Sequence, residues 1–228
     1  MERDALKRMA AEAALEQIKD GMIIGMGSGS TVMHLITLLG PKVQKQDMEL
    51  LVVPTSYDTM QLCIAAGIRL TTLDEHPTLD LAIDGADEVD PNLNLIKGGG
   101  AALTREKIVG SAAKLLVILV DESKVVKTLG EKFPLPLEVL PFALPLVLHR
   151  LKKFGTPQLR MSNKKLGPVV TDNGNFIVDL CNPQITKHSD MENQLNNIPG
   201  VIENGLFINM ADLVYIGSEK GVQILTKL

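Results

Sequence analysis

The chain has 228 residues, of which 45% are hydrophobic and 22% charged, a composition that supports a packed core and excludes extensive disorder. Lysine and arginine number 23 against 27 aspartate and glutamate residues, so the net charge is −4 and nucleic acid is not an expected partner. The charged first residues, and the lack of an apolar run long enough to span a bilayer, predict a soluble cytoplasmic protein with no membrane partner. Two distant cysteines, Cys63 and Cys181, and no histidine cluster predict neither a disulfide nor a metal site.

The first half of the chain alternates between helical patterns and short apolar runs. Apolar spacing predicts, in chain order, helix 3–20, strand 22–24, helix 32–39, strand 50–53, helix 56–66, strands 68–73 and 79–83, helix 102–113 and strand 115–120. Continuous apolar strands that alternate with helices are typical of a parallel sheet covered on both faces. The expected fold class is therefore α/β, with a Rossmann-like, mostly parallel sheet covered by helices.

The pattern changes after Gly130, where a proline-rich extended stretch begins. Predicted elements then follow as extended segment 133–139, helix 143–154, strand 158–162, a hairpin at Asn173-Gly174 and helix 190–198. This β-α-β-β-α-β order predicts a smaller ferredoxin-like α+β domain over residues 131–205. The apolar segments 206–210, 212–217 and 222–225 are too few for a third domain and are expected to return to the first sheet. The larger Rossmann-like domain would then comprise residues 1–130 and 206–228.

The first motif is the glycine loop 25–31, Gly-Met-Gly-Ser-Gly-Ser-Thr, between a predicted strand and a helix. Backbone N–H groups and the positive end of the helix would face the occupant of such a loop, which favours an anion. Hydroxyl groups at Ser28, Ser30 and Thr31 add donors suited to phosphate, whereas a plain tight turn with an N-cap is the alternative. A dinucleotide fingerprint is incomplete because Ser30 stands at its third glycine, and the Walker A lysine is lacking.

The second motif is a group of carboxylates directly after strand 79–83. In open parallel sheets this end of a strand is the ligand-binding end. Asp84 and Asp87 are the better candidates because they flank the flexible Gly85-Ala86 step, and the EF-hand pattern is not matched. The remaining acids are expected to be solvated turn residues; they are Asp80, Glu88 and Asp90.

The third motif is the glycine triplet 98–100, preceded by Lys97 and followed by a predicted helix. Three successive glycines let a backbone approach a ligand closely, and they cost conformational entropy on ordering, so a purely structural role explains them less well. Glu106 lies early in the helix, where interaction with the helix dipole is the simpler interpretation. Lys124 follows strand 115–120 and is selected only because it lies at the same sheet edge.

Together these segments resemble ribose-5-phosphate isomerase of the A type. The resemblance covers nearly the whole chain and is carried by Gly25–Thr31, Asp84–Glu88, Lys97–Lys107, Phe133–Pro136, Val170–Asn175 and Ile198–Val201. It implies cofactor-free interconversion of ribose 5-phosphate and ribulose 5-phosphate through an enediolate, in the non-oxidative branch of the pentose phosphate pathway, with Glu106 as the proton-transferring base. The family usually has threonine at the position of Ser28, and serine keeps the hydroxyl group.

The resemblance also implies the residues of the site. Catalysis is expected from Glu106, Asp84, Asp87 and Lys97, and substrate binding from Lys7, Ser28, Gly29, Ser30, Thr31, Gly85, Ala86, Gly98, Gly99, Gly100 and Lys124. We expect Lys97 and neighbouring backbone N–H groups to stabilise the enediolate, and the 28–31 loop with Lys124 to bind phosphate. Either Asp84 or Asp87 would open the sugar ring, and the residues alone do not decide between them.

Two other functions stay open from the residues. A non-catalytic sugar-phosphate-sensing domain would use a related sheet, although it has no need of Glu106 beside the glycine triplet. A nucleotide-dependent dehydrogenase is opposed by the incomplete fingerprint. Membership of the family would further imply a homodimer or homotetramer with a small sugar phosphate as partner.

Overall fold

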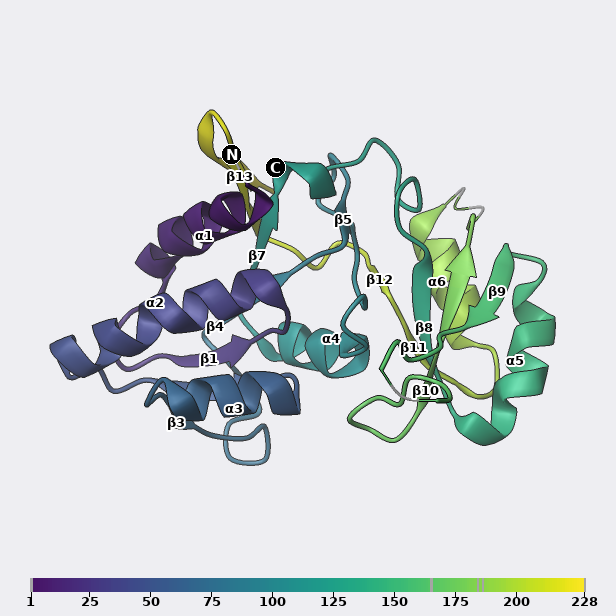
Figure 1. Cartoon of the computed structure of the whole chain (residues 1–228), viewed down its shortest axis with the longest axis horizontal. Helices are drawn as coiled ribbons and strands as arrows, with labels where there is room; N and C mark the ends of the chain where they lie inside the picture. The colour runs from purple at the N-terminus through teal and green to yellow at the C-terminus, as the bar shows by residue number, and fades with distance from the viewer. Residues whose placement is uncertain (1, 165, 184, 186, 228) are drawn as a thin grey trace.

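A seven-stranded sheet forms the centre of the computed structural model, which describes residues 2–164, 166–183, 185 and 187–227 (Figure 1). Its strands are β1 (Ile23–Met26), β2 (Leu51–Pro54), β3 (Arg69–Leu70), β4 (Leu81–Gly85), β7 (Leu116–Asp121), β13 (Leu213–Ser218) and β14 (Gly221–Thr226). They are arranged in the order β14-β13-β7-β4-β1-β2-β3. Neighbouring strands are parallel except at the edge, where β14 pairs antiparallel with β13. The predicted mostly parallel sheet is therefore confirmed.

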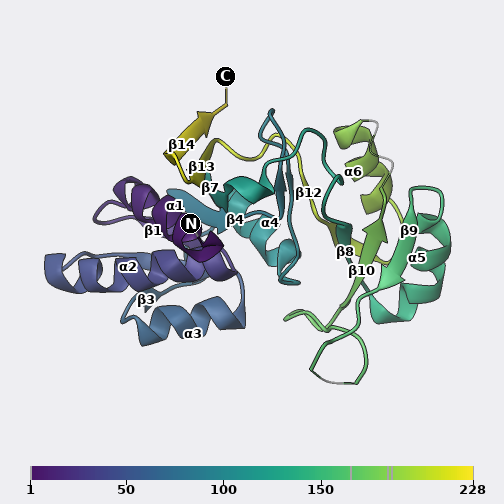
Figure 2. The ribbon, with the colours of Figure 1, turned by 45° about the horizontal axis from the view of Figure 1, so that its top comes forward.

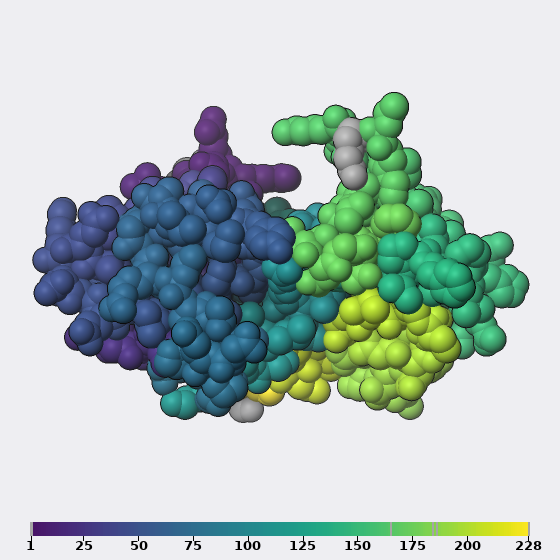
Figure 3. Space-filling view, turned by 90° about the horizontal axis from the view of Figure 1, so that it is seen from below, coloured from purple at the N-terminus to yellow at the C-terminus, as the bar shows by residue number. Residues whose placement is uncertain are grey.

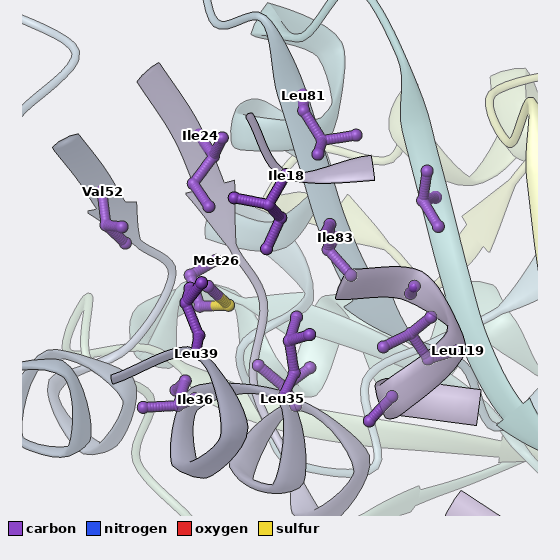
Figure 4. Packing of buried hydrophobic residues seen from close by; sticks show 14 of the residues in the cluster. Ile18, Ile24, Met26, Leu35, Ile36, Leu39, Val52, Leu81, Ile83 and Leu119 are labelled. Carbon is purple, nitrogen blue, oxygen red and sulfur yellow. The ribbon is translucent and has the colours of Figure 1, made fainter. Parts of the chain in front are cut away.

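Helices cover both faces of this sheet and bury two separate cores. They are α1 (Arg3–Ala14), which continues as a 3-10 turn (Leu15–Gln17), α2 (Ser30–Gln46), α3 (Tyr57–Ala65) and α4 (Leu103–Ala112). On one face α1 and α2 pack on the central strands, and Figure 4 shows Leu35 of α2 facing Ile83 of β4 and Leu39 of α2 beside Met26 of β1. On the other face Val109 of α4 belongs to the second core. Burial of these apolar side chains stabilises the sheet at about 25 cal/mol per Å².

Helix α2 follows the predicted apolar spacing but is longer than predicted. Apolar residues at i, i+3, i+4 and i+7 turn one face of α2 to the core, namely Val32, Leu35, Ile36 and Leu39. The prediction ended this helix at residue 39, yet it continues through Pro41 to Gln46. Val43 packs against the same core, which explains why the proline does not end the helix.

A three-stranded sheet lies beside the large one and corrects one expectation. It consists of β5 (Glu88–Val89), β6 (Leu95–Ile96) and β12 (Leu206–Phe207), in the order β12-β6-β5. Segment 206–210 was expected to join the first sheet, but β12 pairs with β6 instead. Phe207 is fully buried in the second core, so this pairing places an aromatic ring in that core. Two-residue strands carry too short a pattern to be recognised in a sequence.

The second half of the chain builds a four-stranded antiparallel sheet with two helices. Its elements are β8 (Leu135–Val139), α5 (Leu144–Leu151), β9 (Thr156–Leu159), β10 (Phe176–Cys181), α6 (His188–Asn196) and β11 (Val201–Asn204). The order β11-β8-β10-β9, with every pair antiparallel, is the ferredoxin-like arrangement that the sequence predicts. The predicted turn is present, since the N–H of Gly174 donates to the carbonyl of Thr171 at 2.9 Å. The segment before this turn forms no strand of its own among the described residues and pairs with β10 through an isolated bridge between Val170 and Phe176.

The two sheets form two lobes that lie side by side (Figures 1 and 2). The space-filling view shows a hollow between the lobes, where a green loop of the smaller lobe projects toward the purple N-terminal part (Figure 3). Strands β13 and β14 return to the large sheet as predicted. Domain boundaries at residues 130 and 205 stay a prediction. In the part of the chain that the structure describes, no helix is both long and apolar enough to cross a membrane.

Candidate active site

The carboxyl ends of β1, β4 and β7 meet at a cavity of about 150 Å³. The cavity is lined by Lys7, Ser28, Gly29, Ser30, Thr31, Gly85, Ala86, Asp87, Lys97, Gly98, Gly99, Gly100, Glu106 and Lys124. All of the predicted site residues except Asp84 are therefore on its wall. Asp84 lies directly behind the wall, in contact with Lys97. Segments far apart in the sequence converge here because parallel strands place their carboxyl ends at one edge.

The glycine loop between β1 and α2 forms one side of the cavity. Gly29 has a φ of +102°, a conformation that favours glycine, and α2 begins at the next residue. A Cβ at Gly27 would lie 2.0 Å from the carboxyl carbon of Asp84, so glycine is required for this close approach. The N–H of Ser28 donates to Oδ1 of Asp84 at 3.2 Å. The loop is thus fixed to the end of β4, with the N-terminus of α2 open to the cavity.

Polar contacts on both sides hold this loop in place. The hydroxyl of Ser28 lies 2.8 to 3.1 Å from the hydroxyl groups of Thr55, Ser56 and Thr59, which hold it on the side of α3. From the other side, Nζ of Lys7 in α1 donates to Oγ of Ser30 at 2.9 Å. A cation and a helix N-terminus therefore meet at the loop, an arrangement that favours an anion. The sequence pattern alone gave no reason to select the three hydroxyl partners of Ser28.

At the opposite side, Lys97 lies between two buried carboxylates. Its Nζ is 3.0 Å from Oδ2 of Asp84 and 3.1 Å from Oε2 of Glu106. The same nitrogen donates to the carbonyl of Gly85 at 2.7 Å, and it lies 5.4 Å from the centroid of the Phe207 ring. The three charged side chains are each about 5% exposed. Glu106 is therefore a buried residue of the cavity rather than a surface residue that only complements the dipole of α4.

Burial and charge shift the pKa of each member of this cluster. Burial raises the pKa of Glu106 to about 8, with the negative charge of Asp84 adding to the effect and Lys97 opposing it. Burial also raises the pKa of Asp84 above its ordinary value, against the attraction of Lys97. Burial disfavours the charged form of Lys97, but Asp84 and Glu106 outweigh it and raise the pKa of the ammonium. Oε2 of Glu106 is buried, and its polar contact among the described residues is the ion pair with Nζ of Lys97 at 3.1 Å.

Asp87 and the glycine triplet complete the cavity. Oδ2 of Asp87 accepts the N–H of Gly99 at 2.7 Å, and its Oδ1 is 3.9 Å from Nζ of Lys124. A Cβ at Gly99 would lie 2.7 Å from Oδ1 of Asp87, so the close approach of this carboxylate needs glycine there. Lys124 belongs to a 3-10 turn (Glu122–Lys124) after β7, at the edge where the sequence placed it. Lys124, which lines the cavity together with Lys7 and Lys97, thus lies beside Asp87.

Two of the acids that were expected to be solvated are buried, which corrects that expectation. Glu88 accepts the backbone N–H groups of Gly130, Lys132 and Phe133 at 2.5 to 2.7 Å. Asp90 accepts two backbone N–H groups within its own loop at 2.8 Å. Backbone donors can solvate a carboxylate in place of water, and a single sequence does not reveal them. Asp80 is more exposed, and it pairs with Lys114 at 2.9 Å.

Sequence reasoning missed two residues of the smaller lobe that reach the site. Glu138 on β8 is fully buried and accepts hydrogen bonds from Thr104, Thr171, Asn173 and Asn175. A single carboxylate inside an apolar strand was the signal that could have identified it. Arg160, which follows β9, contacts the glycine triplet. Across the described segments, no three histidine, cysteine, aspartate or glutamate side chains gather closely enough to hold a metal ion.

The doubly covered parallel sheet, with a glycine loop and a buried carboxylate–lysine cluster at its carboxyl edge, is the architecture of an α/β enzyme. A family model described as ribose 5-phosphate isomerase A (phosphoriboisomerase A) matches residues 51–221. The chain belongs to the ribose 5-phosphate isomerase A family.

Individual relatives agree with this assignment over the full length. A ribose-5-phosphate isomerase A of Pyrococcus abyssi is 49% identical, with all of both chains covered. One of Thermosynechococcus vestitus is 51% identical over 95% of this chain and 94% of its own. The solved ribose 5-phosphate isomerase A of Methanocaldococcus jannaschii superposes with a TM-score of 0.95 at 45% identity, covering 99% of this chain and all of its own. A D-ribose-5-phosphate isomerase solved with phospho-erythronic acid gives 0.97 at 48% identity, with the same coverage.

Proposed function

We propose that this protein interconverts ribose 5-phosphate and ribulose 5-phosphate through an enediolate, with Glu106 carrying the proton between C2 and C1. The observation that carries the proposal is the buried carboxylate of Glu106 on the cavity wall, which has a raised pKa and whose Oε2 lies 3.1 Å from Nζ of Lys97. This oxygen belongs to the same cavity as the 28–31 loop. A base at one end and an anion site at the other suit a small phosphorylated sugar.

The phosphate would bind at the N-terminus of α2. Gly29, Ser30 and Thr31 line the cavity at the start of α2, where the N–H groups of the first turn have no intrahelical partner, and Lys7 contributes a cation through its contact with Ser30. Lys124 supplies a second cation on the cavity wall. Since the phosphate does not react, these contacts hold the sugar equally in the ground state and the transition state, and they place its reacting carbons near Glu106.

Ring opening would use Asp87. This carboxylate lines the cavity, whereas Asp84 is behind Lys97 with its oxygens occupied by Ser28, Gly85 and Lys97. A carboxylate on the wall can take the proton of the anomeric hydroxyl while the ring oxygen receives one, which leaves the open-chain aldehyde. Asp84 would instead keep Lys97 charged and in place. The two aspartates thus take different roles because their burial differs.

Proton transfer itself would involve Glu106 and Lys97. The carboxylate removes the C2 proton and returns it to C1, and the proton of the C2 hydroxyl passes to O1 within the enediolate. The Lys97 ammonium and neighbouring backbone N–H groups stabilise the negative charge on the two oxygens meanwhile. A positioned base supplies about 10² to 10⁴-fold, or roughly 3 to 5 kcal/mol. Enzymes lower barriers by at least about 8 kcal/mol, so the preorganised charges must supply the larger share. Groups of the chain and of the substrate itself suffice for these proton movements, and we propose that no cofactor takes part.

Incubating the purified protein with ribose 5-phosphate in a buffer that contains a chelator tests the proposal directly. Appearance of ribulose 5-phosphate, followed by its ketose absorbance or by loss of the C2 deuterium of labelled substrate, is the expected result. A sugar-phosphate sensor would bind the substrate, as calorimetry would show, and form no ketose. Binding without turnover would therefore overturn the proposal, as would activity that vanishes with the chelator. Assembly as a homodimer or homotetramer, and a cytoplasmic location, stay predictions.

A further inference from the structure

Arg160 of the smaller lobe contacts the backbone of the active-site glycine triplet. Its Nη1 donates to the carbonyl oxygen of Gly98 at 2.8 Å and to that of Gly99 at 3.1 Å. Its Nε donates to Oδ2 of Asp179 on β10 at 2.8 Å, and Nη2 pairs with the other carboxylate oxygen. Arg160 itself does not line the cavity. One guanidinium group therefore links a β10 carboxylate to two consecutive peptide groups of the site.

The position of Arg160 is itself fixed from both sides. Its N–H donates to the carbonyl of Ile177 at 2.9 Å, and its carbonyl accepts the N–H of Val169 at 2.9 Å. Its side chain and that of Asp179 are 16% and 18% exposed, so water has limited access to the pair. A planar guanidinium held by a carboxylate on one edge presents its remaining N–H groups in a fixed direction. The smaller lobe thus offers a rigid donor to the larger one.

The orientation of two peptide groups determines where their N–H groups point. In a trans peptide the carbonyl and the N–H of the following residue point in opposite directions. Because the carbonyl groups of Gly98 and Gly99 turn toward Arg160, the N–H groups of Gly99 and Gly100 turn away from it. The N–H of Gly99 donates to Asp87 on the cavity wall, and in the described residues that of Gly100 makes no hydrogen bond. Gly100 therefore presents a donor at the cavity.

Little else holds this segment in place. A Cβ at Gly100 would meet no atom of the described residues within 4 Å, so packing does not restrain that peptide. Gly98 has a φ of +114°, and each glycine has wide backbone freedom. The contacts that orient the triplet are the N–H of Ala101 on the Gly98 carbonyl, the Asp87 carboxylate and Arg160. Of these, Arg160 alone binds both carbonyl groups.

We propose that Arg160, held by Asp179, is a positioning residue that orients the Gly100 N–H group toward an oxygen atom of the enediolate and the Gly99 N–H group toward Asp87. This inference rests on the proposed function and adds to it a contribution of the smaller lobe to catalysis. A preorganised N–H donor is strongest where charge develops, since it needs no reorganisation when the substrate reacts. Contact of its carbonyl with a cation also polarises a peptide group and makes its N–H a better donor.

The test is Arg160→Lys, which keeps the charge but cannot hold Asp179 and two carbonyl groups with one ammonium. We expect kcat to fall about 10- to 100-fold, somewhat less than the loss of a whole oxyanion donor, with KM for ribose 5-phosphate within about threefold. Phospho-erythronic acid carries a planar carboxylate that resembles the two enediolate oxygens. Its inhibition constant should rise in step with the fall in kcat/KM, while that of inorganic phosphate stays unchanged.

Two further variants separate positioning from general damage to the fold. Asp179→Asn keeps the arginine but weakens its anchor, so it should lower kcat in the same direction by a smaller factor. Arg150→Lys, at an exposed site on α5, should change neither kcat nor the inhibition constants. Thermal unfolding by circular dichroism gives the folded fraction of each variant, to which rates are normalised, and Asp179→Asn serves alone if Arg160→Lys does not fold.

Three results would overturn the inference. The first is a normalised kcat within twofold of the wild type in both Arg160→Lys and Asp179→Asn. The second is a parallel rise of KM and of the inhibition constant for phosphate with kcat unchanged, which would assign Arg160 to the binding of the substrate as a whole. The third is an unchanged affinity for phospho-erythronic acid despite a lower kcat. A wild-type protein that forms no ketose would instead contradict the proposed function.

Discussion

Lys97 and Glu106 form a buried pair in which Nζ lies 3.1 Å from Oε2, and the same Nζ lies 3.0 Å from Oδ2 of Asp84. One ammonium can neutralise one carboxylate, so the burial of a second negative charge is costly. Burial and the negative charge of Asp84 therefore raise the pKa of Glu106 to about 8. A carboxyl group that gains and loses its proton near neutral pH is suited to carry a proton from one carbon to its neighbour.

Replacing Glu106 by glutamine keeps the shape of the side chain and removes the base. We expect Glu106→Gln to lower kcat by about 10² to 10⁴-fold, the usual contribution of a positioned base. Binding of phospho-erythronic acid should stay measurable by calorimetry, because the anion site at residues 28–31 is unchanged. Glu12→Gln, at an exposed position of α1, is the matched control and should retain full activity. A loss of less than tenfold in kcat would refute the role of Glu106 as the base.

The raised pKa of Glu106 also predicts the pH dependence of the reaction. The carboxylate is the basic form, so kcat/KM should rise as pH increases through about 8 and level off above it. Initial rates at low substrate concentration between pH 5 and 10 measure this profile. In Glu106→Gln the remaining activity should not show this rise of kcat/KM near pH 8. A profile with its acidic limb near the ordinary glutamate value, about 4.3, would contradict the assignment.

Stability should depend on pH in the opposite direction. The folded pKa of Glu106 is above its unfolded value, so the folded state keeps a proton that the unfolded state releases between about 4.5 and 8. The stabilisation is complete below the unfolded pKa and is lost as pH rises through the folded one. Relative to Glu106→Gln, the wild type should lose on the order of 3 to 5 kcal/mol of unfolding free energy from pH 5 to 9. Urea denaturation of both proteins at the two pH values measures these unfolding free energies. The same change with pH in the wild type and in Glu106→Gln would contradict the prediction.

Much of the fold and most of the site could be predicted from the sequence, for identifiable reasons. Buried parallel strands leave continuous apolar runs, such as 116–120, and amphipathic helices repeat with a period near 3.6. The glycine loop, the acids after β4 and the glycine triplet each follow an apolar strand. Because carboxyl ends of parallel strands share one edge, the convergence of the first two on one cavity followed from topology, whereas the triplet follows β6 of the separate antiparallel sheet.

What could not be predicted depends on long-range contacts. The sequence does not indicate that Arg160 contacts Gly98, sixty-two residues away. It also does not indicate that backbone N–H groups of residues 130–133 donate hydrogen bonds to the buried carboxylate of Glu88. The raised pKa of Glu106 likewise arises from burial and from Asp84, which only the folded chain brings together. Strand β12 was misplaced because two residues carry no period. Short elements and polar partners were therefore missed where packing, rather than local pattern, decides the structure.

Lys124 lies on the cavity wall with a partly exposed side chain, 3.9 Å from Asp87. If it binds phosphate equally before and during the reaction, Lys124→Ala should raise KM about 10-fold or more and leave kcat nearly unchanged. The increase should shrink with added salt, because an exposed cation is screened. Lys127→Ala, three residues further at an exposed position, is the control and should behave as the wild type. A defect confined to kcat would instead place Lys124 at the reacting end of the sugar.

Glu138 connects α4 to the turn at residues 171–175. Its carboxylate accepts hydrogen bonds from Thr104 in the first turn of α4 and from Thr171, Asn173 and Asn175, and the residue is fully buried. Glu138→Ala would leave these donors without their shared acceptor, and each unsatisfied buried donor costs about 1 to 3 kcal/mol. We expect a loss of unfolding free energy of at least about 3 kcal/mol in urea denaturation.

Glu138→Gln distinguishes the loss of acceptor oxygens from the loss of volume. Its amide nitrogen would face the asparagine amides as a donor against donors, whereas the Thr104 hydroxyl could turn to accept from it, so it should destabilise the protein by an intermediate amount. Glu131→Ala, at an exposed position before β8, should change stability by less than about 0.5 kcal/mol. Since Thr104 is two residues before Glu106, kcat of the folded Glu138→Gln protein should also fall. Equal stability of Glu138→Ala and the wild type would show that the hydrogen bonds to Glu138 do not hold the two lobes together.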